Sequence, residues 1–215
     1  MSLQQFAQEN AQVKVILIGE SHNNATDADA VLSIVKIFED RGHNLTFYFE
    51  HFPGQVDQHE ALSKGQISPK EFMKTPLVYP GKNGDVRQSP EEYWGHPEES
   101  AKLERLMQFA QDRFIVIKGH DLVQKDFSSK GLNDWLGRRD VWMVNYMMSD
   151  IRQTRFGTAV GFVGRAHVKP QAHLLRQYLD PETVITLCPD TDGSAASGTI
   201  VKSGSGARRD YTFTP

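Results

Sequence analysis

Two short motifs with the same glycine and histidine spacing lie far apart in the chain. "GESH" covers residues 19–22 and "GRAH" covers residues 164–167, so each reads Gly-x-x-His. His22 and His167 are candidate catalytic side chains, because imidazole is the side chain that titrates near neutral pH. Each motif follows an apolar run that is typical of a buried strand. Since open α/β sheets bind ligands at the carboxyl ends of their strands, the pair predicts that both imidazoles face one crevice.

Polar side chains also end two other apolar runs. "FYFEHF" places Glu50 and His51 after one run, and "IVIKGHD" places His120 and Asp121 after another. A buried carboxylate or imidazole is costly unless it is paired, so such a strand is expected to open onto a polar cleft. We take Glu50 as a candidate site residue. The other three are interpreted as ordinary loop residues, because neighbouring side chains on a strand point to opposite faces.

Hydrophobic patterning predicts the elements that position these residues. Strands are expected at residues 13–20, 44–52, 113–121, 159–168 and 183–188, and helices at residues 26–42, 132–156 and 171–179. The repeated order of strand and helix predicts an α/β fold with a mostly parallel central sheet and helices on both faces.

The alternation pauses in two regions of what we expect to be a single domain, residues 1–215. Residues 53–97 contain six prolines and no strand-like run, which favours a helical and loop insertion or lid. Residues 189–215 form a small, polar, glycine-rich tail. The tail either adds a short antiparallel hairpin or stays partly disordered.

Composition excludes several classes of function. The net charge is -3 and charged residues make up 24% of the chain, which favours neither a nucleic-acid partner nor an anionic membrane. No stretch is long and apolar enough to span a bilayer. The single cysteine, Cys188, permits no internal disulfide. We expect a cytoplasmic protein, or the mature form of an exported one if a signal was removed.

Four motifs together resemble a known superfamily. "LIGESH", "FYFEHF", "GRRDVWM" (137–143) and "FVGRAH" are similar in type and order to motifs of the superfamily that joins erythromycin esterases, Tiki and TraB-type proteases and ChaN-type haem-binding lipoproteins. The resemblance covers most of the chain. It implies an α/β core whose pocket is formed by Glu20 and His22, Glu50, Arg139 (or its neighbour Arg138) and His167.

The chain departs from two of these subgroups. Erythromycin esterases have one more residue between the Gly-Glu pair and the histidine, and they are longer. ChaN-type proteins carry a lipoprotein signal, which this sequence lacks, and bind haem through a tyrosine that we align with none of Tyr48, Tyr79, Tyr93 and Tyr146.

A hydrolase of an ester or amide bond is the function that this residue set favours. His22 is the candidate base for water, and Glu20 or Glu50 would fix its tautomer. Arg139 suits the oxyanion or an anionic substrate group, and His167 would be the acid or a second positioning group. Ser21 lacks the context of a nucleophile elbow. The expected partner is a small-molecule or peptide substrate.

Two cofactors remain open alternatives. His22, Glu50 and His167 would make a three-ligand site for a divalent metal; the resemblance to Tiki proteases implies manganese or cobalt, and zinc accepts the same ligands. The resemblance to ChaN implies haem binding without turnover. In that case aromatic residues of the insertion, Phe72, Tyr79, Tyr93 and Trp94, either line the ligand pocket or form the insertion's own small core.

Overall fold

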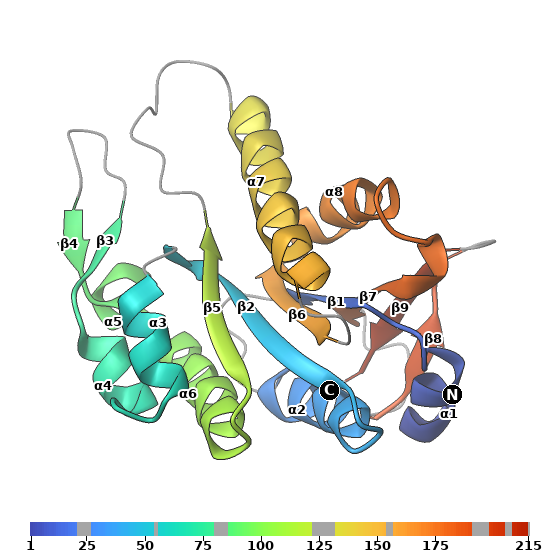
Figure 1. The fold of residues 1–215 in the computed structure, drawn as a ribbon, viewed down its shortest axis with the longest axis horizontal. Helices are drawn as coiled ribbons and strands as arrows, with labels where there is room; N and C mark the ends of the chain where they lie inside the picture. The colour runs from blue at the N-terminus through green and yellow to red at the C-terminus, as the bar shows by residue number, and fades with distance from the viewer. Residues whose placement is uncertain are drawn as a thin grey trace.

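One central sheet with helices on both faces forms the body of the protein in this computed structural model (Figure 1). The structure describes residues 1–20, 27–53, 56–79, 86–121, 132–153, 157–190, 198–204 and 208–214. Within these residues the main sheet has seven strands, in the order β5 (Val116–Asp121), β2 (Asn44–Pro53), β6 (Gly157–Gly164), β1 (Val15–Glu20), β7 (Val184–Pro189), β9 (Arg209–Phe213) and β8 (Ile200–Lys202).

The strands that carry the candidate residues run parallel and lie side by side. β6 lies between β1 and β2, so that Glu20 is level with Gly164, and Phe162 is level with Phe49. All strand pairs described in this sheet are parallel except β8 with β9. The predicted fold class is therefore confirmed. The carboxyl ends of β1, β2 and β6 meet at one edge of the sheet.

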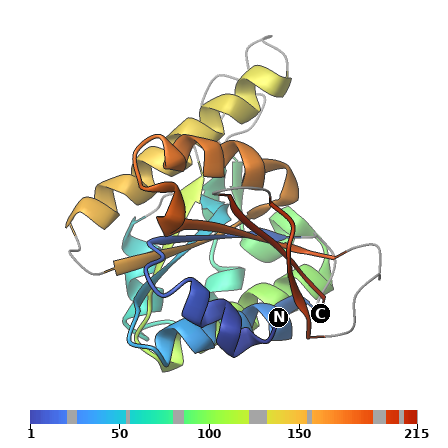
Figure 2. The ribbon, with the colours of Figure 1, turned by 90° about the vertical axis from the view of Figure 1, so that its right-hand side faces the viewer.

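Two layers of helices cover the two faces, as Figure 2 shows. The lower layer of that view consists of α1 (Leu3–Glu9), α2 (Asp27–Glu39) and α6 (Pro97–Asp112), and the upper layer of α7 (Leu132–Gln153) and α8 (Arg165–Arg176). Strand alternation assigns apolar side chains to each layer. Ile16 and Ile18 belong to the core between the sheet and the lower layer of helices. Leu17 and Tyr48 belong to the core between the sheet and the upper layer.

The boundary between β6 and α8 differs from the predicted one. The strand ends at Gly164 and the helix begins at Arg165, so His167 lies in the first turn of a helix and not at the end of a strand. The sequence predicts a helix that begins only at residue 171. Pro170 is the sixth residue of α8 and lies inside the helix, where its missing N–H leaves one backbone hydrogen bond unmade.

The β5 boundary also differs. The strand begins at Val116 and not at residue 113, because Phe114 adopts a left-handed backbone (φ 56°) with its side chain 90% exposed. Such a conformation ends α6 and turns the chain toward the sheet.

Residues between β2 and β5 form short helices and a two-stranded sheet before α6. These elements are α3 (Val56–Ser63), α4 (Pro69–Lys74), β3 (Leu77–Tyr79), β4 (Val86–Gln88) and α5 (Pro90–Trp94). Ser68 and Ser89 start α4 and α5 with capping boxes that Glu71 and Glu92 complete. Ser63 bonds the backbone N–H of Ile117 at 2.8 Å, so α3 covers the outer edge of β5.

The tail contributes β8 and β9, which lie at the side of the sheet opposite to β5. They follow a 3₁₀ turn (Pro181–Thr183) and β7 in the chain. Tyr211 of β9 packs edge-on against Phe6 of α1, with 4.8 Å between ring centroids. Among the helices described, none combines the length and apolarity that a bilayer span requires.

Candidate functional site

Glu50 is the centre of a buried cluster at the end of β2. Its side chain is 6% exposed, and strand alternation places it on the same face as Tyr48, under α7. Arg139 of α7 donates from Nη2 to Oε1 at 2.6 Å, and the backbone N–H of Gly164 donates to Oε2 at 2.6 Å. Since Gly164 is the N-cap of α8, the carboxylate also lies at the positive end of that helix.

His167 joins Glu50 to a second carboxylate. Its Nε2 lies 3.2 Å from Glu50 Oε1, and its Nδ1 lies 2.8 Å from Asp140 Oδ1. Burial lowers the pKa of His167, but hydrogen bonds and the negative charges of Asp140 and Glu50 outweigh burial and raise the pKa to about 9. The ring is therefore protonated at neutral pH and donates from both nitrogens.

The cluster contains two cations and two anions in close contact. Arg139 and protonated His167 balance Glu50 and Asp140, and all four side chains are at most 12% exposed. Buried charges are tolerated when they are paired and hydrogen-bonded in this way.

Asp140 was missed as a site residue in the sequence, although the quoted motif "GRRDVWM" contains it. The spacing of buried residues along α7 indicates that Asp140 is buried. Asp140, Met143 and Met147 follow at three- and four-residue intervals and all three are buried, so the carboxylate lies on the apolar face of α7.

Glu20 lies at the end of β1 in a different polar cluster. Its carboxylate is 4% exposed and faces Lys102 of α6, with 3.5 Å between Oε1 and Nζ. Lys102 also pairs with Glu99 at 3.0 Å. Like Ile16 and Ile18, Glu20 is directed to the layer of α2 and α6. Lys102 and Glu99 were not among the predicted site residues.

The predicted residues are thus brought together in part. Glu50, Arg139 and His167 are in direct contact, and Glu20 approaches the same edge from the other face of the sheet. His22 lies outside the described residues. Arg138, the alternative to Arg139, is on the exposed side of α7.

Two of the residues interpreted as loop residues, His51 and Asp121, have side chains outside the described part. His120 is a buried residue of β5 whose ring packs edge-on against Tyr48, with 5.8 Å between centroids.

The first turn of α8 lies close against β1 at Gly19. A Cβ on Gly19 would lie 2.7 Å from Val168 Cγ2 and 3.0 Å from Cys188 Sγ. Only glycine therefore leaves room for the first turn of α8 to lie against β1. Burial raises the pKa of the Cys188 thiol, which fits its place as an apolar contact.

Two members of the expected metal-ligand set, Glu50 and His167, are in contact, with 3.2 Å between Glu50 Oε1 and His167 Nε2, and the third, His22, lies outside the described residues. The other ring nitrogen of His167 contacts Asp140. Among the described residues no group of three or more His, Cys, Asp or Glu side chains is arranged to hold a metal ion.

The structure describes the side chains of two of the aromatic residues proposed for a haem pocket, and these two differ in burial. Phe72 is fully buried in the core under α6, and Tyr93 is 46% exposed. Tyr48 donates its hydroxyl to Asp150 at 2.6 Å, and burial together with Asp150 raises the pKa of the phenol, so it is not a ready phenolate ligand. The side chains of Tyr79 and Trp94 lie outside the described part.

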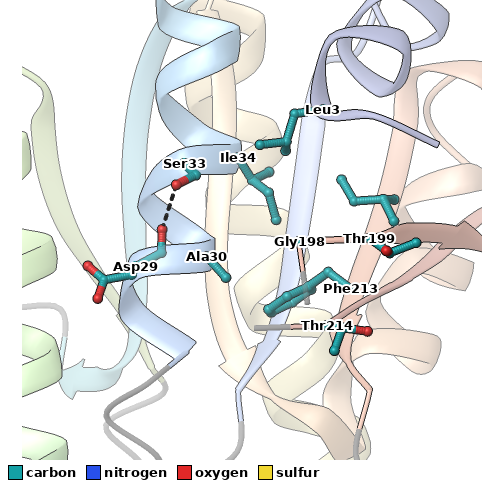
Figure 3. A pocket seen from close by; sticks show the side chains of 10 residues that line it. Leu3, Asp29, Ala30, Ser33, Ile34, Gly198, Thr199, Phe213 and Thr214 are labelled. Atoms are coloured by element: carbon teal, nitrogen blue, oxygen red, sulfur yellow. Dashed lines mark hydrogen bonds between the residues drawn. The ribbon is translucent and has the colours of Figure 1, made fainter. Parts of the chain in front are cut away.

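A cavity of about 190 Å³ lies between α1, α2 and the β8–β9 pair (Figure 3). Leu3, Ala30, Ile34 and Phe213 give it apolar walls, with hydroxyls of threonine and serine around them. None of the candidate site residues lines this cavity, and its volume is below the roughly 300–1,000 Å³ of typical ligand pockets.

These observations define an α/β protein with a buried charge cluster at the carboxyl edge of a mostly parallel sheet. No family model matches the sequence, and no curated protein matches it either. The fold is similar to that of the type III effector HopBA1, with a TM-score of 0.65 and 11% identity over 99% of this chain and 93% of that chain.

A second solved structure, described as cofacial haem binding to ChaN of Campylobacter jejuni, has a TM-score of 0.60 and 12% identity, and covers 99% of this chain and 91% of that chain. At these identities the likeness concerns the fold alone. It agrees at that level with the resemblance of the sequence motifs to ChaN-type proteins.

Proposed function

We propose that the protein is a hydrolase that cleaves an ester or amide bond of a small-molecule or peptide substrate at the carboxyl edge of the sheet. One observation carries the proposal: two cations, Arg139 and protonated His167, converge on one buried carboxylate, Glu50. Glu50 and Asp140 hold the donors of Arg139 and His167 in place, and preorganised donors in a buried site are what the oxyanion of acyl transfer needs.

In the proposed reaction, His22 takes a proton from a water molecule while the water oxygen attacks the substrate carbonyl carbon. The carbonyl oxygen gains negative charge, which Arg139 stabilises. His167 then gives its Nε2 proton to the departing oxygen or nitrogen as the scissile bond breaks.

The contacts of His167 suit the role of acid. The 2.8 Å bond to Asp140 holds the ring through Nδ1, while the contact of Nε2 with Glu50 is longer, at 3.2 Å. Nε2 is therefore the nitrogen that a substrate can redirect. With a pKa near 9 the ring is protonated before the reaction starts. The base must then be another group, and His22 fills that role in the sequence motif.

Turnover of a panel of p-nitrophenyl esters and p-nitroanilide amides tests the proposal. We expect His22→Ala and His167→Gln each to lower kcat/KM by at least about 100-fold, which is the usual contribution of an acid or base. His173→Ala is the matched control because His173 lies on the exposed side of α8. It should leave kcat/KM unchanged.

Folding is measured in the same samples, since His167 is buried and its replacement is expected to lower the melting temperature. Rates are therefore compared well below the melting point of each variant. A folded His22→Ala variant that retains wild-type turnover would contradict the proposal, as would a wild-type protein that hydrolyses no member of the panel.

Haem binding without turnover is the second candidate, and the likeness of the fold to ChaN favours it. Titration with haemin separates the two candidates. A stoichiometric absorbance band near the violet end of the spectrum, in a protein that hydrolyses nothing, would replace the hydrolase by the haem-binding function. An unchanged haemin spectrum removes the second candidate.

A further inference from the structure

Three charged side chains are buried together beneath the end of β1. Lys102 is 2% exposed, Glu99 1% and Glu20 4%, and the ammonium lies 3.0 Å from Glu99 and 3.5 Å from Glu20. Side chains of these types are almost never fully buried unless they are paired. The cluster carries a formal charge of minus one when all three groups are ionised.

The position of Lys102 within α6 is unusual for a lysine. It lies on the same helical face as Leu103, Leu106 and Met107, all of which are buried in the core between the sheet and the lower layer of helices. The side chain is therefore directed into the protein toward β1. A second carboxylate, Glu20 of β1, also faces the ammonium, so Lys102 connects α6 to the end of β1.

Glu20 lies beside the central strand β6 at the end of β1. Glu20 is level with Gly164 of β6, and the backbone N–H of Gly164 donates to Glu50. The two carboxylates thus flank the same residue of the central strand, one from each face of the sheet. Glu20 also lies two residues before His22, the candidate base.

We propose that Lys102 is a positioning residue of the hydrolytic site, which fixes the Glu20 carboxylate at the end of β1. This inference rests on the hydrolase proposed above. Lys102 touches no reacting atom. It acts through Glu20, and it makes helix α6 part of the framework of the site.

Kinetics of Lys102 variants test the inference with the best p-nitrophenyl ester or p-nitroanilide of the panel. Lys102→Met should lower kcat by at least about 10-fold with little change in KM, because misplacement of a catalytic group costs rate rather than binding. Lys102→Arg should recover most of the loss. The matched control is Lys64→Met, which removes an exposed lysine that is paired with Glu60.

Removal of the ammonium alone leaves two buried carboxylates, so Lys102→Met is expected to fold poorly. The double variant Lys102→Gln/Glu99→Gln avoids this problem, because its cluster keeps the wild-type charge of minus one while Glu20 loses its ammonium. We expect it to fold and still to lose kcat. Melting curves and circular dichroism establish the folded fraction.

The kinetic results separate failure of the positioning role from failure of the proposed function. If the wild-type enzyme turns over substrate and the folded double variant retains wild-type kcat, the positioning role is wrong and the hydrolase stands. The kcat of each variant is divided by its folded fraction. If the corrected kcat of Lys102→Arg is as low as that of Lys102→Met, the role of Lys102 is structural only. If the wild-type protein hydrolyses nothing, the proposed function fails and the inference fails with it.

Discussion

His167 keeps its proton because carboxylates face both of its ring nitrogens. Asp140 and Glu50 lie 2.8 Å and 3.2 Å from the ring, and their charges offset the effect of burial. An imidazole held in this state is an acid and an electrostatic group at neutral pH. It is not a base, and this divides the two motif histidines into different roles in the proposed reaction.

The raised pKa predicts a loss of stability at alkaline pH. The pKa of His167 is about 9 in the folded protein and close to 6.5 for an ordinary imidazole. Its stabilising contribution is therefore complete below about pH 6.5 and lost as the pH rises through about 9, with a size on the order of 3 kcal/mol. Melting temperatures of wild type and His167→Gln should converge over this range.

Titration of the histidine ring signals by NMR measures the same pKa directly. The signal absent from His167→Gln should titrate near pH 9 in wild type, and Asp140→Asn should move that midpoint toward 6.5. His43 is an internal reference, since burial and the nearby charges of Lys14 and Arg41 lower its pKa. A His167 midpoint close to 6.5 would contradict the charge pairing described for the cluster.

At the residue scale, the sequence predicted the groups that stand at motif positions and missed those hidden on apolar helix faces. Glu50, Arg139 and His167 were predicted and lie in contact. Asp140 and Lys102 were missed. Their positions at helical spacing among buried apolar residues indicate burial, whereas the motifs mark only the ends of strands.

At the scale of elements, the approach of α8 to β1 is the most constrained contact near the site. Gly19→Ala places a methyl group 2.7 Å from Val168 and 3.0 Å from Cys188, so we expect a loss of about 1–3 kcal/mol in the free energy of unfolding. Val168→Ala in the same chain should recover part of it. Urea unfolding measures both effects.

The matched control is the same substitution where space is open. Gly137 lies within α7, and a Cβ there would meet nothing within 4 Å. Gly137→Ala should therefore stabilise the protein by about 0.5–1 kcal/mol, because alanine favours the helix. Equal effects of the two substitutions would mean that crowding at Gly19 is not the cause.

Element types were easier to predict from the sequence than element ends. Long apolar runs indicated the parallel strands, because both faces of such a sheet are buried. The start of α8 was predicted too late, since the predicted helix covers residues 171–179 and the observed helix begins at Arg165. Helix α1 was not expected, although Ser2 and Gln5 form the capping box that begins it.

On the scale of the whole molecule, two hydrophobic cores separated by the sheet support the two halves of the site. Phe47 and Phe49 of β2 pack under α6, where Phe109 stacks on Phe47, while Tyr48 packs under α7. The separation was not predictable from the motifs, because they indicate strand ends and not the face from which each side chain leaves.

The two cores predict that the halves of the site open separately in native-state hydrogen exchange. Lys102→Gln/Glu99→Gln weakens only the lower layer, so amides of α6 should exchange faster while those of α8 and β6 keep their wild-type protection. Mass spectrometry of peptides from both layers measures this difference. Uniform acceleration across both layers would mean that the molecule opens as one cooperative unit.

If the lower layer opens by itself, the folded molecules divide into a fully packed form and a form with α6 detached. A molecule that has lost only the packing of α6 would still hold Glu50, Arg139 and His167 in place and would lack an anchored Glu20. Such a species would have the near-native shape of the sheet and yet be inactive in the proposed reaction. The abundance of the protein in a sample would then overstate its active fraction, by an amount set by the local stability of one helix.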